Sequence, residues 1–143
     1  MRYFDTSALA PLILPEASSA LVERYINRLP GGELATSHWA RVEIASLLAR
    51  KIRAREFDRD QARGAAADFE SLFARSFELL DTRSEDFELA RRYLLEWSTG
   101  LRAGDALHLA IAVNRNIKSI CTLDKTMLKA GRALSLPMES EIR

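Results

Sequence analysis

Short apolar runs alternate along the chain with longer stretches in which apolar residues recur every three or four positions. The short runs predict strands at residues 2–5 and in the segments ELATS, SFELLD and KSICTL. The periodic stretches predict helices at residues 7–14, 17–29, 38–55, 58–74, 85–97 and 125–133, and one that begins at about residue 103. The segment LSLPME predicts a terminal strand, weakened by Pro137.

Strands that alternate with helices favour a parallel sheet with helices on both faces. We therefore expect an α/β fold, a three-layer α/β/α sandwich around a mostly parallel sheet of four or five short strands. No repeat, low-complexity tract or linker interrupts the pattern, so residues 1–143 are expected to form one domain. Functional crevices of such sheets lie beyond the carboxyl ends of the strands. Asp5 ends the first predicted strand and Asp124 follows the fourth, which places both at that edge.

Composition narrows the class of protein. The 143 residues are 48% hydrophobic and 29% charged, as in ordinary globular proteins. No apolar run approaches the roughly 20 residues of a membrane span, and the beginning, MRYFDTS, does not resemble a secretion signal. Cys121 is the only cysteine, which excludes an intrachain disulfide and a Cys-rich zinc site. These features favour a reducing, cytoplasmic setting away from membranes.

The net charge of +1 conceals an uneven distribution. Residues 40–55 contain five basic residues and one acidic residue, Glu43, and residues 114–134 contain five basic residues and one acidic residue, Asp124. Solvated helix faces explain each basic run by itself. An isolated carboxylate within each run also suits an acidic metal site surrounded by charge that attracts phosphate.

Four carboxylates are the candidates for chemistry: Asp5, Glu43, Asp105 and Asp124. Taken singly, Asp5 and Asp124 are explained as helix caps, and the other two as acidic residues near the positive end of a helix dipole. Taken together they are harder to explain in this way. Glu43 has apolar helical neighbours, and Asp105 precedes the nearly uncharged segment ALHLAIA, so both carboxylates are predicted to lie beside core residues.

Carboxylates that meet at one edge of a sheet repel each other by about 4 kcal/mol per pair at ~4 Å and an effective dielectric constant of 20. No Lys or Arg occurs at a spacing that would neutralise all four. A hard divalent cation, Mg²⁺ or Mn²⁺, would do so. Such an ion lowers the pKa of a bound water and stabilises the leaving oxygen of a phosphodiester. The acidic set therefore predicts metal-dependent phosphodiester hydrolysis.

The segments RYFDTSAL, TSHWARVEIASLL, LRAGDALHLAIA and CTLDKTML resemble the four motifs of PIN-domain ribonucleases, above all the VapC-type toxins of type II toxin–antitoxin systems. The similarity extends in order over nearly the whole chain. It implies a PIN-like fold and an endoribonuclease that hydrolyses RNA phosphodiester bonds and is neutralised by a small VapB-type antitoxin protein. It also implies a homodimer.

The same resemblance assigns roles to particular residues. It implies a Mg²⁺ or Mn²⁺ site formed by Asp5, Glu43, Asp105 and Asp124, and hydroxyl support from Thr6, Ser7 and Thr122. Family members often have a further acidic residue two positions after the last of the four carboxylates. Thr126 stands there in this chain, so the number of metal ions stays open.

Three further side chains are candidates for substrate contacts: Arg41, Arg102 and His108. Either arginine could reach a phosphate, although a surface arginine needs no such role. His108 lies three residues after Asp105 and could hydrogen-bond a metal-ligating carboxylate. A histidine on such a helix is more often a structural residue.

The amphipathic helices at residues 38–55 and 58–74 are expected to form an antiparallel pair with a groove for an antitoxin helix or tail. Trp39, Trp97, Phe69 and Phe73 are interpreted as core or subunit contacts.

Two other classes of function remain. One is a non-catalytic PIN-like module that binds RNA or protein, and the other is a phosphotransfer or receiver-type α/β domain with Asp5 as the acceptor. A haloacid-dehalogenase-like phosphatase would carry a second aspartate where Ser7 stands, and a receiver would carry adjacent acidic residues near the first strand. The chain has no GxGxxG or Walker loop to indicate nucleotide binding.

Overall fold

The computed structural model describes residues 1–139 and 142. Four strands form where the apolar runs predict them: β1 (Arg2–Phe4), β2 (Leu34–Ser37), β3 (Glu78–Leu80) and β4 (Ser119–Cys121). They make one sheet in the order β3-β2-β1-β4, and every pairing is parallel. The predicted parallel sheet is therefore confirmed, with four strands.

The order of the strands determines where a crevice can form. The chain adds β2 and β3 on one side of β1, then returns to place β4 on the other side. The strand order thus reverses between β1 and β4, and ligands of open α/β sheets bind at such a reversal, beyond the carboxyl ends of the strands. Just past those ends, the amide of Asp5 donates to the carbonyl oxygen of Cys121 at 3.1 Å.

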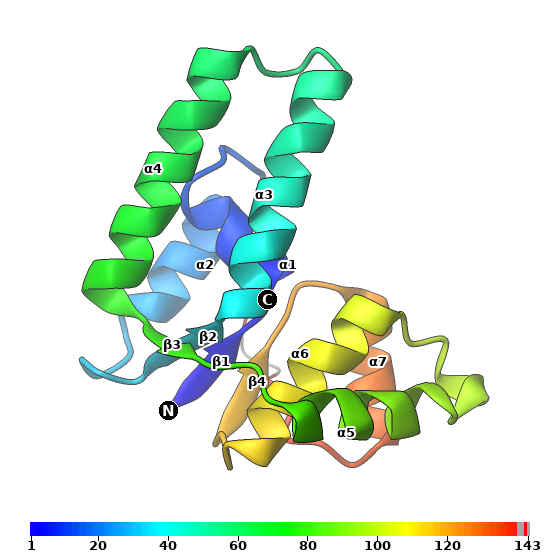
Figure 1. The fold of residues 1–143 in the computed structure, drawn as a ribbon. Helices are drawn as coiled ribbons and strands as arrows, with labels where there is room; N and C mark the ends of the chain where they lie inside the picture. Colours follow the sequence, from blue (N-terminus) through cyan, green and yellow to red (C-terminus); the bar gives the residue numbers. More distant parts are fainter. Residues whose placement is uncertain (140–141, 143) are drawn as a thin grey trace.

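The helical elements of the described residues are α1 (Thr6–Leu9), η1 (Ala10–Leu12, a 3₁₀ turn), α2 (Ser19–Ile26), α3 (His38–Arg53), α4 (Arg59–Ser76), α5 (Ser84–Leu94), η2 (Trp97–Thr99, a 3₁₀ turn), α6 (Ala103–Asn114) and α7 (Lys125–Ala133). The helices α1 to α4 lie on one face of the sheet and α5 to α7 on the other (Figure 1). The three-layer α/β/α sandwich is therefore confirmed. In the described part of the chain, none of these helices is long and apolar enough to cross a bilayer.

Consecutive residues of β1 point into the two cores. Phe4 is buried with apolar side chains of α1 to α4, and Tyr3 is buried with those of α5 to α7. The helices α3 and α4 form the expected antiparallel pair (Figure 1), and Phe69 and Phe73 of α4 pack into the first core. The helix α6 is buried almost throughout, as its uncharged sequence predicts.

The first helix is shorter than the predicted range 7–14. The α-helix ends at Leu9, and a 3₁₀ turn with Pro11 near its start replaces the remainder. Proline lacks an amide hydrogen and its ring clashes with the preceding turn, so it kinks or breaks an α-helix, and here the α-helix ends before it. The predicted stop at Pro15 thus overlooked an earlier proline.

The helix predicted at residues 85–97 ends earlier, at Leu94. Trp97 begins a 3₁₀ turn and is 82% exposed, so the core interpretation is wrong for this residue and a subunit contact stays a prediction. The predicted strand LSLPME is reduced to one parallel bridge between Ile120 and Met138. Pro137 has no amide hydrogen with which to extend the ladder.

Candidate active site

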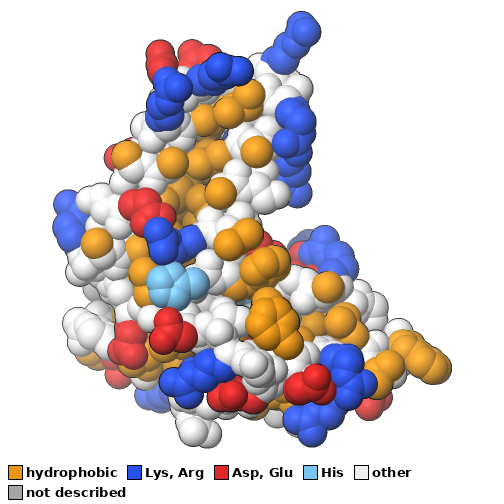
Figure 2. Space-filling view, in the orientation of Figure 1, with side chains coloured by type: hydrophobic (Ala, Val, Ile, Leu, Met, Phe, Trp, Pro, Cys, Tyr) orange, Lys and Arg blue, Asp and Glu red, His pale blue; other side chains and the backbone are white. Residues whose placement is uncertain are grey.

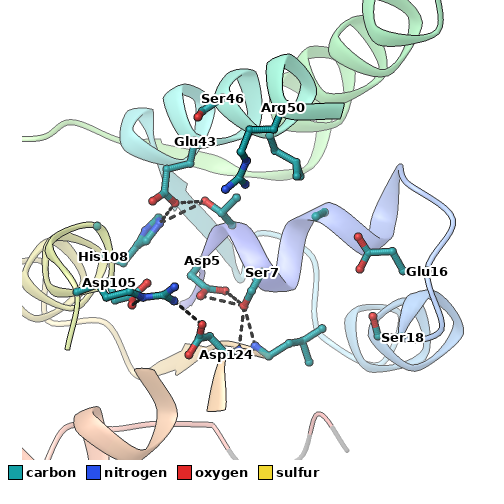
Figure 3. A pocket seen from close by; sticks show the side chains of 16 residues that line it. Asp5, Ser7, Glu16, Ser18, Glu43, Ser46, Arg50, Asp105, His108 and Asp124 are labelled. Carbon is teal, nitrogen blue, oxygen red and sulfur yellow. Dashed lines mark hydrogen bonds and ion pairs between the residues drawn. The ribbon is translucent and has the colours of Figure 1, made fainter. Parts of the chain in front are cut away.

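A cavity of about 790 Å³ opens at the carboxyl edge of the sheet. Its walls come from the β1–α1 junction, from α3, from the beginning of α6 and from the β4–α7 junction (Figure 3). All four carboxylates singled out in the sequence line it: Asp5, Glu43, Asp105 and Asp124. Segments separated by up to 119 positions along the chain (124 − 5) thus contribute to one site.

Asp5 occupies the deepest of the four positions, with 3% of its surface exposed. It is the N-cap of α1, where one carboxylate oxygen accepts from the amide of Ala8 at 3.0 Å. The hydroxyl of Ser7 donates to the same oxygen at 2.8 Å, and that of Thr122 donates to the other at 2.7 Å. Burial raises the pKa of Asp5, because these neutral donors do not fully replace the lost water.

Ser7 joins the two strand ends on which the site depends. While donating to Asp5, its Oγ accepts from the amides of Leu123 at 2.9 Å and Asp124 at 3.2 Å. The β1–α1 and β4–α7 junctions are therefore fastened together through one hydroxyl. Asp124 itself caps α7, accepting from the amide of Thr126 at 2.8 Å, so helix capping and a place in the cavity are compatible.

Glu43 projects from α3 toward the opposite wall (Figure 3). Its Oε2 accepts from the Thr6 hydroxyl and lies 2.7 Å from Nε2 of His108. Burial acts to raise the pKa of Glu43, but the bonds from His108 and Thr6 outweigh it and hold that pKa below its ordinary value. Glu43 is therefore ionised under ordinary conditions.

His108 connects this carboxylate to the second core. Its side chain is 1% exposed, and its Nδ1 lies 2.6 Å from the Tyr3 hydroxyl, which is 2.7 Å from Oγ of Ser37. Burial raises the pKa of Tyr3 far above its ordinary value, so Tyr3 keeps its proton. All contacts are satisfied when Tyr3 donates to Nδ1 and Nε2–H donates to Glu43. Ser37 begins α3 without a side-chain cap bond, because its hydroxyl points to Tyr3.

Arg102 binds two of the carboxylates. Its Nε donates to Asp105 at 2.9 Å and a terminal nitrogen donates to Asp124 at 2.6 Å. Burial raises the pKa of Asp105 although Arg102 opposes it, and the bond to Asp105 in turn raises the pKa of Arg102. The sequence indicates Arg102 only as a candidate phosphate contact. The structure shows that it also offsets the repulsion at the mouth of the cavity.

Gly104 allows α6 to lie close against α3. A Cβ atom built on Gly104 would lie 2.6 Å from Oε1 of Glu43 and 3.6 Å from the ring of Trp39. Real Cβ atoms essentially never show contacts as short as 2.6 Å. The position of Glu43 therefore depends on a residue without a side chain at position 104.

Not every predicted residue lies at the site, and others were overlooked. Arg41 is absent from the cavity lining and forms an ion pair with Glu70 at 2.9 Å. The lining instead includes Ser46 and Arg50, three and seven residues after Glu43 on the same face of α3 (Figure 3). That helical spacing was available in the sequence. Glu16 and Ser18, before α2, also line the cavity, and no local pattern indicated them.

The four carboxylates match a divalent cation in the type of ligand that they offer. The four carboxylates offer only oxygen ligands around one cavity, which is the chemistry that Mg²⁺ and Mn²⁺ prefer. As they stand, however, no three acidic, histidine or cysteine side chains of the described residues are grouped closely enough to hold an ion. Arg102 binds Asp105 and Asp124, and Glu43 is turned toward His108. The donor types therefore fit such an ion, and Arg102 occupies carboxylate oxygens for which the ion would compete.

A family model described as the PIN domain matches residues 2–133. The chain belongs to the PIN domain family. No curated protein sequence matches it. The expected PIN-like fold is thus confirmed, as is the resemblance from which it was expected.

Solved structures show the same PIN fold over nearly the whole chain. VapC20 of Mycobacterium tuberculosis, a sarcin–ricin loop cleaving toxin, is 20% identical with a TM-score of 0.72, over 92% of this chain and 95% of that one. VapBC-1 of nontypeable Haemophilus influenzae is 14% identical with a TM-score of 0.70 and full coverage of both chains. FitAcB of Neisseria gonorrhoeae is 14% identical with a TM-score of 0.70, over 99% and 98%. At these identities the likeness concerns the fold.

Proposed function

We propose that this PIN domain is an endoribonuclease that depends on a divalent metal ion and serves as the toxin of a VapBC-type toxin–antitoxin pair. One observation supports it above all: four carboxylates from four separate segments line a single cavity at the reversal of strand order. Solved structures with this fold include a toxin that cleaves the sarcin–ricin loop, and a VapBC assembly.

The metal site would be formed by Asp5, Asp105 and Asp124, with Glu43 across the cavity. A bound Mg²⁺ or Mn²⁺ supplies an activated water and stabilises the charge on the leaving oxygen. Because Arg102 donates to both Asp105 and Asp124, its guanidinium has to leave these oxygens before they can act as ligands.

The chain's own residues do the positioning. Ser7 and Thr122 hold the Asp5 carboxylate in one orientation through hydrogen bonds of 2.8 and 2.7 Å. Glu43, fixed by Thr6 and His108 and ionised, is placed to accept a hydrogen bond from a water in the cavity. Side chains held in this way lose little conformational entropy when the transition state forms. This preorganisation is a usual source of the rate enhancement of enzymes.

Arg50 is the residue placed to bind the substrate backbone. It lines the cavity from α3, and it forms no ion pair within the described part of the chain. An unpaired guanidinium beside an acidic cavity can bind a phosphate oxygen and so offset the repulsion between polyanionic RNA and the carboxylates.

The antitoxin would bind along α3 and α4, where hydrophobic side chains gather between the two helices (Figure 2). Val42 and Ile52 on α3 are 57% and 36% exposed, which gives an amphipathic helix or tail apolar contacts. A basic side chain from the antitoxin would inhibit by pairing with the carboxylates. The exposed Trp97 fits the expected homodimer contact.

The test uses the purified chain and a mixture of end-labelled RNAs that includes transfer, ribosomal and messenger RNA. We expect cleavage in millimolar Mg²⁺ or Mn²⁺ and none in chelator. The same metals should raise the melting temperature, because they bind the native state. Absence of cleavage of every RNA in metal would contradict the nuclease assignment, provided the chain is folded by circular dichroism.

A non-catalytic PIN-like module remains the second candidate, and Arg102 is the observation in its favour. With its guanidinium on Asp105 and Asp124, the cavity is partly neutralised without a metal. Such a module would bind RNA with no cleavage and no metal-dependent rise in melting temperature. The phosphotransfer alternative is disfavoured, because Asp5 lacks the adjacent acidic residues of a receiver and Ser7 stands where a phosphatase of the haloacid-dehalogenase type has its second aspartate.

A further inference from the structure

A second cavity, of about 630 Å³, lies beside the candidate active site. The two cavities share Leu123 in their linings, and Thr122, which donates to Asp5, lines the second. The second cavity therefore adjoins the first just past the end of β4, and residues of α7 line it.

The wall of this cavity is basic. Lys125, Lys129 and Arg132 recur at positions i, i+4 and i+7 of α7 and so lie on one face of the helix. All three are exposed, and none forms an ion pair with any acidic residue that the structure describes. Three unpaired cations in one row attract an anionic partner.

The same lining is also apolar, through Leu123, Leu128 and Ile142. A partner that carries both negative charges and flat, less polar groups matches a lining of cations and apolar side chains. Single-stranded nucleic acid has this chemistry, with phosphates along the backbone and bases that pack on apolar side chains. An acidic protein segment is also anionic, but it has no scissile phosphodiester that would connect this surface with the carboxylates of the first cavity.

We propose that an RNA strand continues from the acidic cavity over Leu123 onto the basic face of α7, where Lys125, Lys129 and Arg132 bind phosphates on one side of the cleaved bond. This rests on the proposed ribonuclease function and adds to it the path of the substrate. Because Lys125 directly follows Asp124, a strand seated at the carboxylates meets this cation first and the other two along the helix.

The test measures binding of a fluorescent single-stranded RNA by anisotropy, with the full chain in chelator so that cleavage does not interfere. The test variant is K125A/K129A/R132A. The control, R59A/R75A/R92A, removes the same charge from exposed positions that line neither cavity. Both are checked by melting temperature, and Lys129→Glu alone serves if the triple variant does not fold.

We expect the test variant to bind at least tenfold more weakly at about 0.1 M salt. Its slope of log K against log salt should be shallower by about 2, since each phosphate contact to a single strand contributes about 0.7. The control should change affinity less than twofold. RNA binding by the test variant equal to that of the control would overturn the proposal. Loss of binding to a glutamate-rich peptide with unchanged RNA affinity would assign the surface to an acidic protein instead.

The outcome is independent of the parent proposal. A chain that cleaves no RNA in metal contradicts the nuclease assignment, whereas the binding comparison in chelator still shows whether α7 holds RNA. Conversely, cleavage by the wild type together with unchanged binding by K125A/K129A/R132A would leave the nuclease standing and remove only the path along α7.

Discussion

Two aspartates of this PIN domain are almost completely withdrawn from solvent, and their partners differ in kind. Asp86, at the beginning of α5, is 0% exposed, and both of its oxygens accept from the Arg115 guanidinium at 3.1 Å. The amide side chain of Asn114 donates to it at 2.7 Å. Asp5, 3% exposed, accepts only from hydroxyls and a backbone amide, and no Lys or Arg of the described residues pairs with it.

The partners move the two pKa values in opposite directions. Burial acts to raise the pKa of both carboxyls. At Asp86 the bonds from Asn114, the backbone and Arg115 outweigh burial and lower the pKa below its ordinary value, whereas at Asp5 burial prevails and the pKa is raised. A buried carboxylate with its own arginine joins two helices of the fold. A buried carboxylate such as Asp5, whose hydrogen-bond donors are neutral, can instead bind a cation from outside the chain.

The largest contrast is expected in catalysis. Asp5→Asn should lower the rate of RNA cleavage about a thousandfold, because a lost metal ligand removes several kcal/mol of transition-state stabilisation. Asp86→Asn should leave the rate per folded molecule within about threefold. Initial rates on one labelled RNA, normalised to the folded fraction, make the comparison. Comparable rates for Asp5→Asn and the wild type would remove Asp5 from the chemistry.

Stability should show the reverse order. Asp86→Ala should lower the free energy of unfolding by about 3 kcal/mol, because it leaves the mostly buried Arg115 without its partner. Asp5→Asn in chelator should change that free energy by less than about 1 kcal/mol, or raise it. Urea unfolding followed by circular dichroism gives both values. Equal losses in the two variants would show that Asp5 is as structural as Asp86.

Substitution of Arg102 changes the charge that offsets the carboxylates Asp105 and Asp124 in the cavity itself. Arg102→Ala should tighten Mn²⁺ binding about tenfold, since the ion no longer competes with a guanidinium for Asp105 and Asp124. Isothermal titration calorimetry measures the affinity. Arg50→Ala is the matched control, because it removes a cation from the same cavity that does not touch these carboxylates; it should leave the Mn²⁺ affinity unchanged and weaken RNA binding. Weaker Mn²⁺ binding by Arg102→Ala would show that Arg102 assists the site.

The smallest expected difference between Asp5 and Asp86 is in the pH dependence of the free energy of unfolding. Asp86 has a lowered pKa, so its contribution to stability is present above the ordinary value of 3.8 and is lost as the pH falls through its folded pKa. Asp5 has a raised pKa, so its protonated form favours the folded state, and that contribution is lost as the pH rises above 3.8 through its folded pKa.

Melting curves in chelator between pH 3 and pH 8 should therefore show a shallower loss at acid pH for Asp86→Asn. For Asp5→Asn, the decline on raising the pH should be reduced. Identical pH profiles for both variants and the wild type would mean that neither group changes its affinity for protons on folding.

Local patterns in the sequence predicted the elements well wherever tertiary contacts did not intervene. The last helix has the predicted bounds, Lys125–Ala133, because Asp124 caps it and its apolar positions are regular. Strand ends followed by acidic residues predicted which carboxylates share an edge, because all parallel strands present their carboxyl ends together. The break at Pro11 was also readable, and was overlooked.

Pairings between distant residues could not be predicted in this way. Arg102 lies 22 positions from Asp124, and Arg115 lies 29 positions from Asp86. Charge counting shows that such residues exist, but only the packing of α6 against α5 and α7 decides which arginine meets which carboxylate. No local pattern of the sequence distinguishes Asp86 from a surface carboxylate, although it is one of the most buried groups of the protein.

Gly104 has a consequence for how the chemistry of this PIN domain can be altered. Its hydrogen atom faces the Glu43 carboxylate at a place where a methyl group would stand only 2.6 Å from the oxygen. Since that oxygen stands at the end of a side chain and not on the backbone, an alanine would push the carboxylate away from Thr6 and His108 rather than part the helices. The orientation of the Glu43 carboxylate on α3 thus depends on the missing side chain of Gly104 on α6. A single added methyl group would change that orientation without changing any charge of the site.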